Sequence, residues 1–146
     1  KLAKVFAPAY ELIMKYFEAK NVKCTEKDIP FAVYRNIDWS KLSKKGFFAF
    51  LSMMFFHKWE IDIGIPCSSD LNGEGKIKSI DIKAGKFIKT LHQGPYMNVG
   101  KTYEKIVAFA KEQNLNFDNY SIEFYLNDPC EVKPEELQTE VFVPII

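Results

Sequence analysis

The sequence has few of the residue groupings that carry metal or covalent chemistry. Its three cysteines, Cys24, Cys67 and Cys130, lie far apart, with no CxxC pair and no histidine cluster nearby. This spacing argues against a disulfide framework or a zinc site and favours reduced, structural thiols in an intracellular protein. P-loop, GxGxxG, HExxH and GxSxG motifs are also missing, which removes support for phosphate, dinucleotide, zincin and hydrolase-elbow sites. We therefore expect no metal, no organic cofactor and a cytoplasmic location.

The sequence also lacks an excess of either charge and any long apolar run. Its 20 Lys and Arg against 19 Asp and Glu leave a net charge of +1, so we expect no direct binding to nucleic acid. The longest apolar run, Phe47 to Phe56, falls short of the roughly 18 residues that a membrane span needs. An initiator Met and a signal-like start are missing as well, which predicts a trimmed or partly observed chain.

Aromatic residues, by contrast, are abundant. The 146 residues include 13 Phe, 7 Tyr and 2 Trp, and the hydrophobic share is an ordinary 47%. This length and composition predict one folded domain over residues 1–146. The aromatic residues suffice both to build a core and to line an apolar cavity.

A unit of one helix and two strands occurs twice. Tyr10-Glu11-Leu12-Ile13 resembles Tyr103-Glu104-Lys105-Ile106, at an offset of 93 residues. Apolar residues recur there at three- and four-residue steps, which is typical of amphipathic helices, and Pro8 predicts that the first helix begins near it. Each helix is followed by two strand-like runs. These runs are 31–34 and 59–65 in the first copy, and 122–126 and 140–143 in the second.

The two modules, about 1–70 and about 76–146, differ in two ways. A predicted hairpin, Lys76–Asp81 with Lys86–Leu91, precedes the second helix, whereas the matching first strand of module one would lie upstream of the sequence. Module one also carries a Phe-rich insert at 47–56, which is either a short buried helix or a lid or partner surface. We expect an α+β fold in which the modules form one antiparallel sheet, with helices on one face and a ligand groove on the other.

Glu123 is the sharpest candidate for a functional residue. Strand alternation places Ile122 and Phe124 on one face and Glu123 with Tyr125 on the other. If the helices cover the apolar face, the carboxylate faces the groove among aromatic rings. There it would attract cations or act as a general base. The alternative is a solvated residue on the open side of the sheet.

Aromatic side chains form the second set of candidates. Tyr34 is the pseudo-symmetric counterpart of Tyr125, and aromatic faces suit planar or cationic ligands. The predicted ligand-binding aromatics are Tyr34, Tyr125, Phe142, Tyr96 and Trp59. Core packing is the alternative for all of them, and for Tyr103 it is the favoured one. For His92, a turn or capping hydrogen bond is favoured over acid–base work.

Several of these segments resemble the GyrI-like small-molecule-binding family, also called the AraC-type or bacterial transcription activator effector-binding domain. This family includes the drug-binding domain of the multidrug regulator BmrR. The resemblance is specific from about Lys86 onward and looser in the first half, at 30–34 and 64–66. The residues that carry the specific part of the resemblance are His92-Gln93-Gly94-Pro95-Tyr96, Tyr103, Glu123 through Pro129 and Leu137 through Ile145.

The resemblance implies two pseudo-symmetric modules around a ligand groove, with an acidic residue at its centre that falls on Glu123. It further implies binding of lipophilic, often cationic compounds, for effector sensing in a transcription regulator or for sequestration. A hydrolase of strained, cyclopropane-type compounds is the alternative, with Glu123 as general base and Tyr125 beside it. A protein-interaction module that uses the Phe-rich insert is the second alternative. The oligomeric state stays open.

Overall fold

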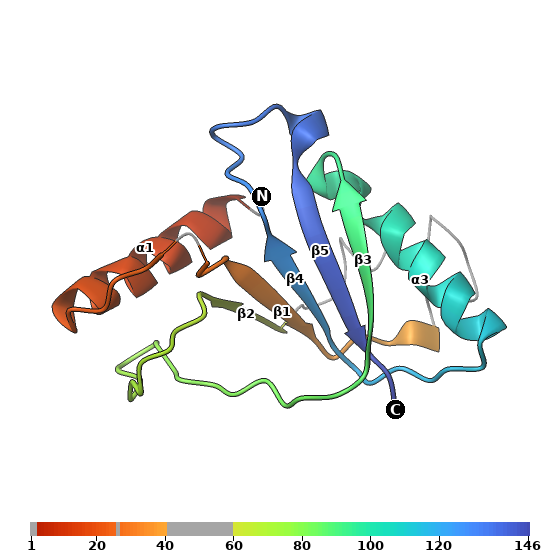
Figure 1. Ribbon diagram of the computed structural model, residues 1–146, viewed down its shortest axis with the longest axis horizontal. Coiled ribbons are helices and arrows are strands. Elements are labelled where there is room, and N and C mark those ends of the chain that lie inside the picture. Colours follow the sequence, from red (N-terminus) through yellow and green to blue (C-terminus); the bar gives the residue numbers. More distant parts are fainter. Residues whose placement is uncertain (1–2, 26, 41–59) are drawn as a thin grey trace.

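A computed structural model describes residues 3–25, 27–40 and 60–146 of the chain. The fold is α+β, as predicted (Figure 1). The helices and strands, in chain order, are α1 (Ala3–Ala19), β1 (Phe31–Arg35), β2 (Glu60–Gly64), β3 (Phe87–Gln93), the short helix η1 (Tyr96–Asn98), α3 (Gly100–Glu112), β4 (Ser121–Tyr125), the short helix η2 (Pro134–Glu136) and β5 (Gln138–Pro144).

The described strands form one antiparallel sheet in the order β2-β1-β4-β5-β3. The two predicted modules meet at its centre, where β1 pairs with β4 and Ala32 lies opposite Glu123. Tyr34 lies two residues after Ala32 in β1, and Tyr125 lies two residues after Glu123 in β4. This antiparallel strand pair therefore has a local twofold axis at Ala32–Glu123, and Tyr34 and Tyr125 are related by it. Figure 1 shows α1 beside β1 and β2 and α3 beside β3.

Both helices lie on the same face of the sheet. On α3, Val99, Tyr103 and Ile106 pack against Val141 and Val143 of β5. The ring of Phe6 on α1 meets the ring of Tyr125, which points to that face as well.

The other face of the sheet is apolar too. Its buried residues are Phe31, Val33 and Ile122, with Phe87, Tyr120, Phe124 and Phe142 packed around them. Because both faces bury apolar side chains, the alternation within β4 alone does not determine which face the helices cover.

The predicted hairpin before the second helix is wrong. Only its second half forms a strand, β3, while residues 65–86 contain neither helix nor strand and run along the lower border of the sheet in Figure 1. Ile80 and Ile82 remain 43% and 40% exposed. The alternation of these isoleucines with polar residues is strand-like. Within the described residues it pairs with no other strand, so the pattern alone does not produce one.

The remaining expectations have different outcomes. Helix α1 begins at Ala3 and includes Pro8, so the predicted start near Pro8 is wrong. All three cysteines are free, as predicted, and all three are exposed. The Phe-rich insert at 47–56 and Trp59 lie outside the described residues. Among the described helices, none has the length and apolar character to cross a membrane.

Candidate functional site

Glu123 is buried at the centre of the sheet, with 5% of its surface exposed. It lies opposite Ala32 of β1 on one side and Val141 of β5 on the other. It therefore shares the face of Val141, which packs against α3. The expectation that Glu123 points away from the helices is wrong. The helices cover the face that carries the valines of β5, and Glu123 lies between the helices and the sheet.

Tyrosine hydroxyl groups satisfy both oxygens of the Glu123 carboxylate. Tyr103 of α3 donates a hydrogen bond to Oε1 at 2.8 Å, and Tyr125 of β4 donates one to Oε2 at 3.1 Å. The Tyr103 hydroxyl also lies 2.8 Å from Ser121 Oγ. The hydroxyl groups of Tyr34 and Tyr125 are 3.1 Å apart. The tyrosines related by the twofold axis thus meet directly above the carboxylate.

Burial and hydrogen bonding act on the Glu123 carboxyl in opposite directions. Burial raises its pKa, and hydrogen bonds from Tyr103, Tyr125 and Tyr34 partly offset that rise. Burial and the nearby carboxylate raise the pKa of each of these phenols, so all three stay protonated donors at neutral pH. Among the described residues, no lysine, arginine or histidine forms an ion pair with Glu123.

Aromatic rings from α1 and η1 surround Tyr125. The Phe6 ring meets it edge-on with centroids 5.7 Å apart, and the Tyr96 ring does so at 5.6 Å. Tyr10 of α1 lies beside Phe6 and donates a hydrogen bond to the Phe31 carbonyl oxygen at 3.3 Å. The carboxylate therefore lies in an aromatic environment built by both modules.

Sequence reasoning missed Phe6 and Tyr10 as members of this cluster and favoured a core role for Tyr103. For Tyr10 and Tyr103, the sequence does contain a signal. The 93-residue offset aligns Tyr10 with Tyr103, and the structure turns both tyrosines toward the central strands. Phe6 belongs to the apolar stripe of the first helix, a pattern that predicts a buried face and no more.

The structure brings Tyr34, Tyr125 and Tyr96 together with Glu123, but not Phe142. Phe142 follows Val141 in β5 and so points to the opposite face, where its ring lies 5.4 Å from that of Phe124. Trp59 lies outside the described residues. His92 is structural, as favoured: its Nδ1 lies 2.9 Å from Thr102 Oγ1 and its Nε2 lies 3.2 Å from the Pro95 carbonyl oxygen.

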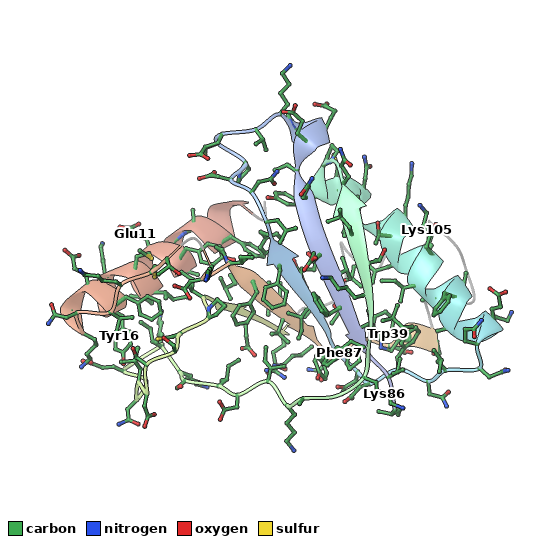
Figure 2. The ribbon with its side chains drawn as sticks, in the orientation of Figure 1. Glu11, Tyr16, Trp39, Lys86, Phe87 and Lys105 are labelled. Carbon is green, nitrogen blue, oxygen red and sulfur yellow. The ribbon has the colours of Figure 1, made fainter. Side chains whose placement is uncertain are left out.

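Two hollows on the surface of the described residues lie away from Glu123. One, of about 360 Å³, is lined by Val33, Tyr120 and residues 80–87, near Phe87 and Lys86 in Figure 2. The other, of about 420 Å³, lies between the second half of α1 and residues 74–77. In the described ranges, no three His, Cys, Asp or Glu residues lie close enough together to hold a metal ion.

The fold and the site define a class of protein in which two helix–strand–strand repeats share one sheet and place a carboxylate at their seam. A sequence model of the GyrI-like small molecule binding domain matches residues 52–146, and the chain belongs to this family. The resemblance seen in the sequence is thereby confirmed. A search of curated proteins finds no significant match.

The chain matches two solved structures. One is a cryo-EM structure of the EcmrR–DNA complex in EcmrR-RPo, at 16% identity and a TM-score of 0.56, with 99% of this chain and 68% of that chain covered. The other is the crystal structure of a hydrolase encoded by lin2189 from Listeria innocua, at 12% identity and a TM-score of 0.46, with 94% and 76% covered. The first similarity extends the fold assignment over nearly the whole chain.

Proposed function

We propose that the protein binds lipophilic organic cations at the Glu123–tyrosine cluster. The observation that carries this proposal is a buried carboxylate that no cationic side chain of the described residues neutralises. Burying an unpaired charge is costly, and a ligand cation would supply the missing partner. The family assignment supports small-molecule binding in general, and the local chemistry supports this ligand class.

The surrounding rings suit the apolar part of such a ligand. Phe6, Tyr10 and Tyr96 are all half-buried and lie around Tyr125 on the side of the helices. Aromatic faces attract cations and provide flat apolar area, and both contributions grow when water is excluded. A planar cation that inserts between these rings and the sheet would replace ring–ring contacts with ring–ligand contacts and bring its charge toward Glu123.

The first prediction concerns the charge of Glu123. In a fluorescence titration, Glu123→Gln should weaken binding of acridine orange, a flat lipophilic cation, by about 1–2 kcal/mol, the scale of one desolvated charge contact. Glutamine keeps the size and an acceptor oxygen but removes the charge. Binding of acridone, a flat uncharged relative, should change little.

An exposed carboxylate provides the matched control. Glu131→Gln removes a charge outside the site and should leave both affinities unchanged. Equal affinity of wild type and Glu123→Gln for acridine orange would refute the role given to Glu123.

A further inference from the structure

Among the described residues, Thr139 carries a buried hydroxyl group that has no hydrogen-bond partner. The residue is 1% exposed, and its Oγ1 has no hydrogen-bond partner within the described part of the chain. Other buried polar side chains there are satisfied: Ser121 bonds Tyr103, His92 bonds Thr102 and Pro95, and Glu123 accepts from tyrosines. Because buried polar groups are normally paired, this exception requires an explanation.

The position of Thr139 connects it to the candidate site. In the sheet it lies directly opposite Tyr125 of β4 and, on its other side, opposite His92 of β3. These side chains share the helix-covered face with Glu123, which is a diagonal neighbour at roughly 7–8 Å. Both ring nitrogens of His92 already have partners. The Thr139 hydroxyl is therefore an unused hydrogen-bonding group next to the aromatic ring that defines the site.

We propose that Thr139 is a second polar anchor of the ligand site and hydrogen-bonds an N–H or O–H group of the bound cation. This inference rests on the proposed function and narrows its ligand class to cations that carry such a group on an aromatic frame. The carboxylate of Glu123 meets the charge, and the Thr139 hydroxyl meets the substituent. Without ligand, the hydroxyl is buried unpaired and lowers the stability of the fold.

The binding test uses two flat acridine cations that differ in their substituents. Both cations carry a protonated ring N–H, the charged group assigned to Glu123; proflavine carries amino N–H donors as well, whereas the methylated amines of acridine orange have none. Thr139→Val, which keeps the shape and removes the hydroxyl, should weaken proflavine binding about three- to tenfold, the scale of one neutral hydrogen bond. Acridine orange should change by less than about twofold, and Thr139→Ser should bind both dyes like wild type.

A stability measurement gives an independent readout on the same variant. In the absence of dye, Thr139→Val should raise the Tm by a few degrees, because the variant no longer buries an unpaired hydroxyl. Thr90→Val is the matched control, since Thr90 lies on the same face in β3 but is only half-buried. It should change neither the Tm nor the ratio of the two dye affinities.

The outcomes separate this inference from the proposed function. The role of Thr139 is overturned if Thr139→Val leaves the ratio of proflavine to acridine orange affinity unchanged, or if it lowers the Tm. Either result counts independently of the outcome for Glu123→Gln. If Glu123→Gln leaves acridine orange affinity unchanged, the proposed function fails, and the dye ratio still shows whether Thr139 contacts the ligand. A loss in Thr139→Val that is equal for both dyes indicates a packing effect and also overturns the inference.

Discussion

The charged form of the Glu123 carboxyl, buried among phenols, destabilises the folded protein. Burial raises the pKa of the Glu123 carboxyl in the folded protein above its value in the unfolded chain, which is near 4.5. The contribution of Glu123 to folding stability is therefore complete only below about pH 4.5, and it is lost as the pH rises through the folded-state pKa. Relative to wild type, Glu123→Gln should therefore gain stability over this range, by about 1.4 kcal/mol for each unit by which the pKa is raised. Urea unfolding between pH 4 and pH 8 measures the difference.

The sign of this difference is the decisive result. Glu131→Gln removes an exposed carboxylate and should follow the wild-type curve. If wild type becomes more stable than Glu123→Gln as the pH rises, the hydrogen bonds of Tyr103 and Tyr125 outweigh burial, and the folded pKa is lowered instead. Combined with weakened dye binding, a stabilised Glu123→Gln would show that one residue trades stability for ligand affinity.

At the same scale, the sequence determines some features of the site and leaves others open. Alternation correctly places Glu123 and Tyr125 on one face of β4, and the repeat correctly relates Tyr34 to Tyr125. The position of Phe142 on the opposite face depends on the register between β4 and β5, which pairs Ile122 with Phe142. Alternation within one strand does not reveal that register, so the sequence alone does not separate Phe142 from the aromatic residues on the Glu123 face. Thr139 had no signal at all, because an unpaired hydroxyl is defined only by its surroundings.

At the scale of elements, Pro8 lies in the second turn of α1, exposed and between Phe6 and Tyr10. Its ring removes one hydrogen bond and crowds the carbonyl of the preceding turn. Pro8→Ala should therefore raise the free energy of unfolding by about 1–3 kcal/mol in urea denaturation. Pro129→Ala changes an exposed proline outside the helices and strands and should lower it by about 0.4–1 kcal/mol. A loss of stability in Pro8→Ala would contradict a helical conformation at this position.

The helices and strands differ in how well sequence periodicity predicts them. Amphipathic spacing and alternation identify α1, α3 and the strands, because each buries the face that its pattern marks. The strands lie close to their predicted bounds, whereas α1 begins at Ala3 and not near Pro8. The segment 76–81 has the pattern of a strand but forms none, and its Ile80 stays exposed. A strand requires a hydrogen-bonding partner as well as a pattern, and the partner is set by the tertiary fold.

At the scale of the whole molecule, the central sheet joins the modules and the site draws on both. Tyr34 and Tyr10 come from the first module, whereas Glu123, Tyr103 and Tyr125 come from the second. The small Ala32 opposite Glu123 leaves room at the axis for the converging tyrosine rings. The duplication visible in the sequence predicts this seam, because paired repeats bring equivalent residues together at their shared axis.

A site at the seam should couple the two modules when ligand binds. With free acridine orange at about 100 times its Kd, amide hydrogen exchange through global opening should slow about 100-fold in β1 and β4 alike, since binding stabilises the native state by mass action. Mass spectrometry of exchanged peptides measures this, and Glu123→Gln, at the same dye concentration, should show less protection in both strands. Slowed exchange confined to residues 80–87 would instead place the dye in the hollow beside Phe87, on the face opposite Glu123. Protection of β4 without β1 would mean that the second module binds ligand alone and that Tyr34 adds nothing to the site.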